Sequence, residues 1–336
     1  MLGIDIGTKS IKIVELSKEG GGFALNASGI VGFNGNPIDK LTDDKEFANL
    51  AQVIKKLHKE AGVSDKNAVV SIPEQLVFTR TIKFPLLTDA EIESAVKWEA
   101  EQYIPIPVAE AIIQHSILER REKTSPPEVL VLLVAAPRTI VEKWMRVVSL
   151  AGLTPVAVET ELIALTRALA PVDKTVLIMD LGATSTDIAI ASRGLLCFSR
   201  SIPIAGEAFT RAVSQTLGVT PLQAEEYKKA YGLGAGQLEG KIKGALSPIL
   251  QMVTDEIKKA IHYYQTEEKG EAPGAIIISG GTSGMRDLPS VFTNLLGAEI
   301  LIGNPFSKVS IDSEVAKKLA PYAPLYAVAV GLALRE

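Results

Sequence analysis

Residues 5–10 read DIGTKS, and residues 180–185 read DLGATS. Each stretch follows a short aliphatic run and precedes another, which is the pattern of a strand, a tight turn and a second strand. One such turn alone is common in β-hairpins, because aspartate and glycine are ordinary turn residues. Two copies in matching surroundings instead predict a duplicated α/β unit whose copies face each other.

The two turns carry the residue types that bind a polyphosphate. A tight turn presents several backbone N–H groups to one anion, and glycine allows close approach because it has no Cβ. Hydroxyl side chains add donors, and the Lys9 ammonium adds positive charge. The residues expected to contact the phosphates are Gly7, Thr8, Lys9, Ser10, Gly182, Ala183, Thr184, Ser185 and Thr186.

Each turn also opens with an aspartate. Asp5 and Asp180 end facing strands, where their carboxylates can hold the waters of a bound Mg²⁺. Magnesium keeps several of its waters and takes few direct protein ligands. The three histidines have no cysteine or carboxylate neighbours at ligand spacing, so we expect no metal role for them.

Composition limits the classes of function. The chain has 336 residues, more than one hydrophobic core usually serves, so two domains are expected. The net charge of −4 leaves no basic surplus for nonspecific binding to nucleic acid or anionic lipid. Cys197 is the only cysteine, which excludes an intrachain disulfide and fits a reducing compartment. Without a signal-peptide pattern or an apolar run of about 20 residues, we expect a soluble, cytoplasmic protein.

The order of expected strands and helices along the chain predicts its domain organisation. We predict a first domain over residues 1–158 and a second over residues 159–336. Residues 77–158 follow the order strand, helix, strand, strand, helix, which predicts a small α+β insert in the first domain. Within the second domain we expect a helical subdomain at residues 206–272.

Two helix starts in this insert have capping-box spacing, Thr88 with Glu91 and Thr139 with Glu142. In a capping box a hydroxyl accepts from the backbone N–H three residues later, and the glutamate accepts from the capping residue's own N–H. We therefore expect one helix to begin after Thr88 and another after Thr139.

The phosphate turns resemble those of the superfamily that includes actin, heat-shock chaperones and sugar kinases, and a third stretch resembles its adenosine motif. These three stretches are residues 3–16, 177–190 and 276–285. Within the superfamily the chain resembles the PilM family of type IV pilus assembly proteins, and more distantly the FtsA family. The stretches that point to PilM are residues 71–73, 84–85 and 98–105. The resemblance implies an actin-like ATPase fold with duplicated ribonuclease H-like domains, binding ATP and Mg²⁺.

The resemblance also implies residues near the nucleoside. The matching residues are Gly206, Glu225, Lys228, Gly280, Gly281 and Thr282. Glu225 and Lys228 would approach the ribose and the adenine, although the same spacing also suits an ion pair within a solvated helix. The glycines would give the base and the α-phosphate room. The family more often has two glycines at the step before the helix, and Ala205 replaces the first of them here.

Hydrolysis in this superfamily uses a polar residue on the helix that connects the domains. Glu161 matches that residue by its distance before Asp180, and Glu159 is the next best match. Asp187 stands where it could face the γ-phosphate. A glutamate at this place could equally serve to cap the helix beginning near Thr160. We expect at most a slow ATPase.

For function, the resemblance implies an ATP-binding scaffold of type IV pilus or related secretion machinery. Its partner would be the cytoplasmic N-terminal tail of a PilN-like inner-membrane protein, held as an extended peptide between the first domain core and the insert. Recruitment to the inner membrane would come through this partner. Two alternatives stay open: an actin- or FtsA-like filament former, and a small-metabolite kinase, for which the insert offers no evident sugar pocket.

Overall fold

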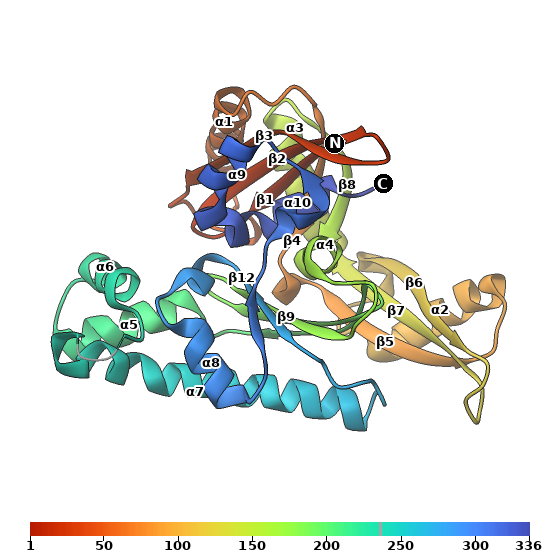
Figure 1. Ribbon diagram of the computed structural model, residues 1–336. Helices are drawn as coiled ribbons and strands as arrows, with labels where there is room; N and C mark the ends of the chain where they lie inside the picture. Colours follow the sequence, from red (N-terminus) through yellow and green to blue (C-terminus); the bar gives the residue numbers. More distant parts are fainter. Residues whose placement is uncertain (235–236) are drawn as a thin grey trace.

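The computed structural model describes residues 1–234 and 237–336. Within these residues the chain forms three sheets, and the first two are built around the two predicted turns (Figure 1). The first sheet has six strands in the order β14-β3-β2-β1-β4-β8. These are β1 (Leu2–Ile6), β2 (Ser10–Glu19), β3 (Gly22–Gly32), β4 (Asn67–Ile72), β8 (Thr154–Thr160) and β14 (Val309–Ser310).

The second sheet repeats the arrangement in five strands, ordered β11-β10-β9-β12-β13. These are β9 (Val176–Leu181), β10 (Thr186–Ser192), β11 (Leu195–Ile202), β12 (Ile276–Ser279) and β13 (Ile300–Ile302). In both sheets the strand before the turn pairs antiparallel with the strand after it and parallel with a later strand, β4 or β12. The duplicated α/β fold predicted from the two turns is confirmed.

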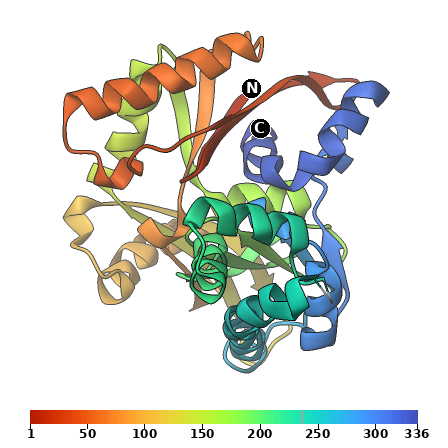
Figure 2. The same ribbon diagram turned by 90° about the vertical axis from the view of Figure 1, so that its left-hand side faces the viewer.

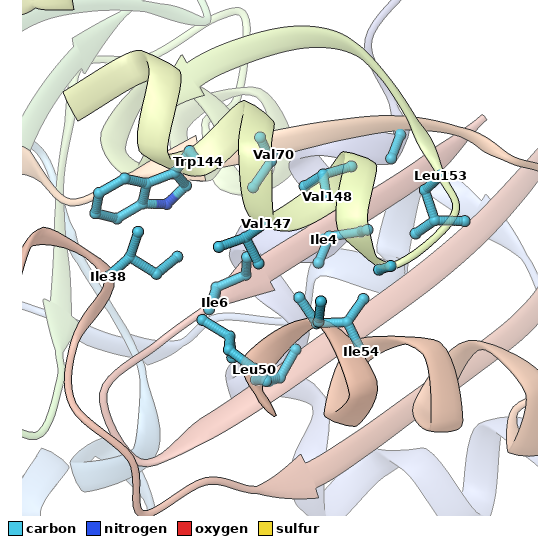
Figure 3. Close-up of a cluster of buried hydrophobic side chains, with 14 of the residues drawn as sticks. Ile4, Ile6, Ile38, Leu50, Ile54, Val70, Trp144, Val147, Val148 and Leu153 are labelled. Atoms are coloured by element: carbon cyan, nitrogen blue, oxygen red, sulfur yellow. The ribbon is translucent and has the colours of Figure 1, made fainter. Parts of the chain in front are cut away.

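One face of the first sheet is covered by α1 (Asp44–Glu60) and α3 (Arg138–Leu150). Asp43 accepts a hydrogen bond from the Glu46 amide at the start of α1, and Gly62, with φ of 70°, follows its end. The apolar sides of both helices pack on β1 and β4, and Trp144 is buried among them (Figure 3). This core fixes the strand that carries Asp5.

Between the two sheets lie α4 (Glu161–Leu169) and α10 (Ala327–Ala333), which share one apolar cluster with residues of both sheets. They cross so closely that a Cβ on Gly331 would lie 1.9 Å from the carbonyl oxygen of Ala164. The far face of the second sheet is covered by helices, as Figure 2 shows from the side. The helices of this region are α5 (Gly206–Leu217), α6 (Pro221–Tyr231), α7 (Lys241–Thr266) and α8 (Leu288–Leu296).

The third sheet is the insert, with strand order β5-β7-β6 and one helix, α2 (Asp89–Tyr103). Its strands are β5 (Phe78–Pro85), β6 (Ala111–Arg121) and β7 (Glu128–Pro137). The capping box predicted at Thr88 is present, since the Thr88 hydroxyl accepts from the Glu91 amide and the Glu91 carboxylate accepts from Thr88. Among the described residues no helix is both long and apolar enough to cross a membrane.

Two expectations about boundaries need correction. Of the predicted insert at residues 77–158, the last helix and strand belong to the first sheet, because α3 packs beside α1 and β8 pairs with β4. The chain also returns there at its end, where β14 joins β3 and α10 packs on β1 and β2, so the stretch 159–336 is not confined to the second sheet. Residues 235–236 of the expected helical subdomain lie outside the described residues.

The capping box predicted at Thr139 is wrong. Helix α3 begins at Arg138, directly after Pro137, and no side chain caps it. Proline ends β7 and, with φ of −57°, already has a backbone angle suited to helix entry, so Thr139 falls inside the first turn.

Candidate functional site

A cleft of about 980 Å³ lies between the two sheets and is lined by both glycine turns. The turns have the same geometry: the Gly7 amide donates to the Ser10 carbonyl at 3.1 Å, and the Gly182 amide donates to the Ser185 carbonyl at 3.0 Å. The residues between the strands lie outside the strand ladders and face the cavity. The structure therefore brings the two predicted loops to opposite walls of one space.

Of the nine residues expected to hold phosphates, eight line this cleft. They are Gly7, Thr8, Lys9, Ser10, Gly182, Ala183, Thr184 and Ser185. The ninth, Thr186, does not: its side chain is fully buried, and its hydroxyl donates to the Ile204 carbonyl at 2.7 Å. Thr186 is the first residue of β10, so its role in the structure is to hold that strand to the loop before α5.

The aspartates that open the two turns both face the cleft. Asp5 lies opposite Lys12 on β2, and its Oδ2 accepts from the Lys12 ammonium at 3.0 Å. Asp180 lies opposite Asp187 on β10. Asp187 accepts from the Ser185 hydroxyl at 2.7 Å through Oδ2, while its buried Oδ1 has no hydrogen-bond partner. An unpartnered buried carboxylate oxygen marks a place where a ligand, a proton or a water belongs.

Glu161 is the first residue of α4 and also faces this cleft. The neighbouring Thr160 caps the helix, accepting from the Ile163 amide at 3.3 Å, so Glu161 is not needed as the cap. Burial raises the pKa of Glu161 well above its ordinary value, and the charges of three aspartates add to that rise. The aspartates are Asp5, Asp187 and Asp180.

Three of these carboxyl groups, on Asp5, Asp180 and Glu161, act on the one ammonium group of Lys12. Burial raises the pKa of Asp180 to about 7, helped by the charges of Asp187 and Asp5. Burial by itself would lower the pKa of Lys12, but Asp5 outweighs it through charge and hydrogen bonding, and the net direction is upward. This excess of carboxylate over cation would attract a divalent cation.

No group of three or more histidine, cysteine or carboxylate side chains in the described part of the chain is arranged to hold a metal ion. A cation bound between Asp5 and Asp180 would therefore keep most of its waters. That donor set fits Mg²⁺, which dehydrates reluctantly. The fit rests on carboxylate chemistry and on the charge excess described above.

The expected nucleoside residues also line the cleft. Lys228 on α6 donates to the Gly206 carbonyl at 3.1 Å and pairs with the Glu225 carboxylate at 2.6 Å. Glu225 also accepts from the Thr210 hydroxyl at 2.5 Å. Burial lowers the pKa of Lys228, and Glu225 opposes that shift. The pair is intrahelical, as one of the earlier alternatives has it, and both residues also line the cleft, where their contact with a nucleoside stays a prediction.

The loop expected to contact adenosine leaves no room for a side chain at Gly280. Gly280 has φ of 83°, and a Cβ there would lie 2.3 Å from Oδ1 of Asp180. A Cβ on Gly206 would lie 2.8 Å from the Thr282 hydroxyl, which itself donates to the Gly182 carbonyl at 3.1 Å. These glycines let the loop, the second phosphate turn and α5 meet without a gap. Gly281 also lines the cleft.

The second candidate for water positioning, Glu159, is occupied elsewhere. Its carboxylate accepts two hydrogen bonds from Arg167, at 2.8 and 2.9 Å, and one from Arg335 at 2.5 Å. This ion-pair network ties β8 to α4 and to the end of the chain. Glu159 does not line the cleft, and Glu161 does.

Sequence reasoning missed several cleft residues. Lys12 could have been found, because a turn at residues 7–10 places it opposite Asp5, between Ile11 and Ile13. Thr210 and Arg211 on α5 gave no comparable signal, since only the folding of α5 against α6 brings them to the cavity. Glu74 also had no signal; it is buried beside the cleft at the start of a short 3-10 turn, η2 (Glu74–Leu76).

Comparison with known proteins agrees with this architecture. A solved structure described as a PilM-PilN type IV pilus biogenesis complex is 30% identical, covers 99% of this chain and 97% of that chain, and superposes with a TM-score of 0.84. MreB5 of Spiroplasma citri, solved with AMPPNP, shares the fold at 15% identity and a TM-score of 0.54, over 98% of this chain and 93% of that one.

Among curated sequences, the cell division protein FtsA of Bacillus subtilis (strain 168) is 22% identical over 348 residues, covering 90% of this chain and 78% of that protein. The family model described as type IV pilus assembly protein PilM matches residues 3–336, which is nearly the whole chain and includes the insert. The protein belongs to the PilM family of type IV pilus assembly proteins.

Proposed function

We propose that this protein is an ATP-binding cytoplasmic scaffold of a type IV pilus machine, which holds the cytoplasmic N-terminal tail of a PilN-like inner-membrane protein. The observation that carries the proposal is the cleft with two equivalent glycine turns inside a fold that matches a PilM-PilN complex over 99% of the chain. Attachment to the inner membrane then comes through the partner.

The two turns would hold the phosphates from opposite sides. Amides of the turn residues and the hydroxyls of Thr8, Ser10 and Thr184 supply donors, and Lys12 is the buried cation nearest the two opening aspartates. The nucleoside would lie toward Glu225 and Lys228, at the end of the cleft where α5 meets α6. A cleft of this volume falls at the upper end of the usual range for ligand sites, about 300–1,000 Å³.

A magnesium ion would supply charge neutralisation between the polyphosphate and the carboxylates, with Asp5 and Asp180 holding its waters. Glu161 and Asp187 would orient the attacking water. Glu161 can accept a proton only in its ionised form, and burial, with the charges of the cleft aspartates, raises its pKa and so favours the protonated form. We therefore expect slow turnover, with bound ATP serving chiefly to hold the two sheets together.

The test uses a synthetic peptide with the sequence of the PilN-like N-terminal tail and a scrambled peptide of the same composition. We expect the tail to bind and the scrambled peptide not to bind, with affinity measured by fluorescence anisotropy in ATP–Mg²⁺ and in nucleotide-free buffer. Failure of the tail to bind under both conditions would overturn the partner assignment. Sedimentation of the protein with ATP but without peptide would instead favour a filament former.

A further inference from the structure

Glu74 is a buried carboxyl group where three parts of the chain meet. It follows Pro73 at the end of β4, and η2 contacts both β5 of the insert and β11 of the second sheet. Its exposed fraction is only 5%, and Oε2 has no hydrogen-bond partner. Burying an unpaired carboxylate costs folding free energy unless the group is protonated, so a functional reason for Glu74 at this position should be sought.

This residue also separates two cavities. Its chain neighbours Pro73 and Gln75 line the nucleotide cleft. Two of the hydroxyls that act on its carboxyl, on Thr79 of β5 and Ser199 of β11, line a smaller cavity of about 300 Å³ between the insert and the second sheet. The side chain of Glu74 therefore lies in the wall between the phosphate site and the interface of the insert with the second sheet.

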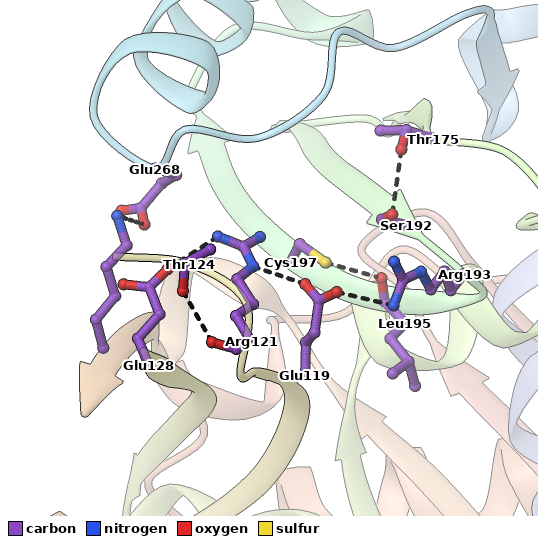
Figure 4. Close-up of polar contacts among 11 residues, drawn as sticks. Glu119, Arg121, Thr124, Glu128, Thr175, Ser192, Arg193, Leu195, Cys197 and Glu268 are labelled. Atoms are coloured by element: carbon purple, nitrogen blue, oxygen red, sulfur yellow. Dashed lines mark hydrogen bonds and ion pairs between the residues drawn. The ribbon is translucent and has the colours of Figure 1, made fainter. Parts of the chain in front are cut away.

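Polar contacts lie along that interface, at the edges of two sheets (Figure 4). The Thr81 hydroxyl donates to the Cys197 carbonyl at 2.5 Å, and Glu119 pairs with Arg193 at 2.8 Å. Lys83 pairs with Glu268, beyond the end of α7, at 3.5 Å. The insert is thus attached to the second sheet by polar contacts at several points, beside an apolar cluster in which Leu132 of β7 packs with Ala191 and Leu196.

Asp187 is the charged group of the cleft that acts on Glu74. Burial raises the pKa of Glu74 to about 7, with the charge of Asp187 adding to the rise. The hydroxyls of Ser199, Thr79 and Thr160 act in the opposite direction. Thr79, like Glu74, has a buried oxygen without a partner within hydrogen-bonding distance.

Other charged groups on the packed elements are engaged elsewhere. On β5, Arg80 lies over the Tyr103 ring at 4.2 Å, and on β11, Arg200 is paired with Glu256. At the start of α4, Glu161 interacts with the three cleft aspartates and Lys12. Asp187 is therefore the charged group through which a change in the cleft reaches Glu74.

We propose that Glu74 is a positioning residue of the nucleotide site: its carboxyl takes up a proton when a polyphosphate enters the cleft, and through Thr79 and Ser199 this alters the contact between the insert and the second sheet. The inference rests on the proposed nucleotide function. A magnesium–ATP complex keeps net negative charge, and negative charge near a carboxyl favours its protonated form. ATP affinity should then fall as pH rises through neutrality.

The experiment is isothermal titration of ATP–Mg²⁺ into the whole protein at pH 7, in two buffers of different ionisation enthalpy. We expect fractional proton uptake that is larger in the wild type than in Glu74→Gln, which keeps the size of the side chain but cannot ionise. Between pH 6 and pH 8 the wild-type Kd should rise by about threefold more than that of the variant. Glu110→Gln, at an exposed position, is the matched control and should behave as the wild type.

Transmission to the interface has its own reporter, because Cys197 is the only cysteine and lines the smaller cavity. Helix α4 stands between the side where α5 and α6 border the cleft and the side of the insert (Figure 1). Closure of the cleft about α4 when ATP binds should therefore open the insert side. Modification of Cys197 by a neutral thiol reagent should then become several-fold faster in the wild type, and the increase should be smaller in Glu74→Gln.

Each outcome decides a different claim. ATP binding with equal proton uptake in wild type and Glu74→Gln overturns this inference and leaves the nucleotide site intact, whereas no ATP binding to the wild type overturns both. If Glu74→Gln does not fold, Ser199→Ala takes its place. Loss of that hydroxyl should move the pH midpoint of ATP affinity upward, and an unchanged midpoint counts against the proposal.

Discussion

The Lys12 ammonium lies 3.0 Å from Oδ2 of Asp5, directly across β1 and β2. At the same place in the second hairpin, Asp180 faces Asp187. The backbone of the site is duplicated, but its charge is not, because one copy has an ammonium where the other has a carboxylate. The chemistry of the cleft follows from this difference.

Replacing Lys12 by Met should destabilise the protein strongly. Both partners are nearly buried, with side-chain exposures of 11% and 7%, so the variant leaves Asp5 unpaired beside other carboxylates. We expect a loss of about 3 kcal/mol in the free energy of unfolding, measured by urea denaturation. Lys9→Met is the matched control: its pair with Glu207 is exposed at 58% and 42%, and its loss should cost less than about 1 kcal/mol. Equal losses of unfolding free energy in the two variants would contradict the difference in burial between the two ion pairs.

Asp180→Asn should weaken the magnesium-dependent part of ATP binding. The amide keeps the size of the side chain in the space beside Gly280 but removes the negative charge that would hold the waters of the ion. We expect the gain in ATP affinity on adding Mg²⁺ to shrink at least about fivefold, while the affinity measured in EDTA stays the same or improves. An unchanged magnesium response would place the ion elsewhere.

Substitutions of the two glutamates around the start of α4 should have different effects, one on stability and the other on ATP hydrolysis. Glu159→Gln breaks the pairing with Arg167 and Arg335 and should cost about 2 kcal/mol of unfolding free energy with little change in ATP affinity. Glu161→Gln should slow single-turnover hydrolysis by at least about tenfold without a comparable loss of stability. The opposite pattern would show that Glu159 is the residue that acts on water.

Glu74 should contribute stability that is lost as pH rises from about 4.5 to 7. Its folded pKa of about 7 exceeds the ordinary value of 4.5, so the folded state holds the proton more tightly. The resulting stabilisation is complete below pH 4.5 and is lost as pH rises through 7. It amounts to about 3 kcal/mol at most. Urea unfolding at pH 5 and pH 8 should show a smaller fall for Glu74→Gln than for the wild type. Asp180 contributes to the fall in both.

Whether a feature of this protein could be predicted from its sequence depends on whether local residues or distant packing determine it. The two turns were predictable because a short-range pattern, an aspartate, a glycine and flanking aliphatic residues, fixes the hairpin locally. The start of α3 was not, because Thr139 could cap only a helix that begins at Ile140, two residues after the observed start. Glu74 and Thr186 depend on which elements pack around them, and that information is absent from local spacing.

The crossing of α4 and α10 joins the two sheets, and it depends on Gly331. A Cβ at this position would lie 1.9 Å from the Ala164 carbonyl oxygen, a backbone atom that cannot move alone. Gly331→Ala should force the helices apart and cost at least about 3 kcal/mol of unfolding free energy. Gly244→Ala provides the control, since this glycine lies in α7 with nothing within 4 Å of the added methyl. There the substitution should stabilise the protein by up to about 1 kcal/mol, as alanine favours a helix. If Gly331→Ala proved as harmless as Gly244→Ala, α4 and α10 could not be packed as closely as described. Other residues would then have to join the two sheets.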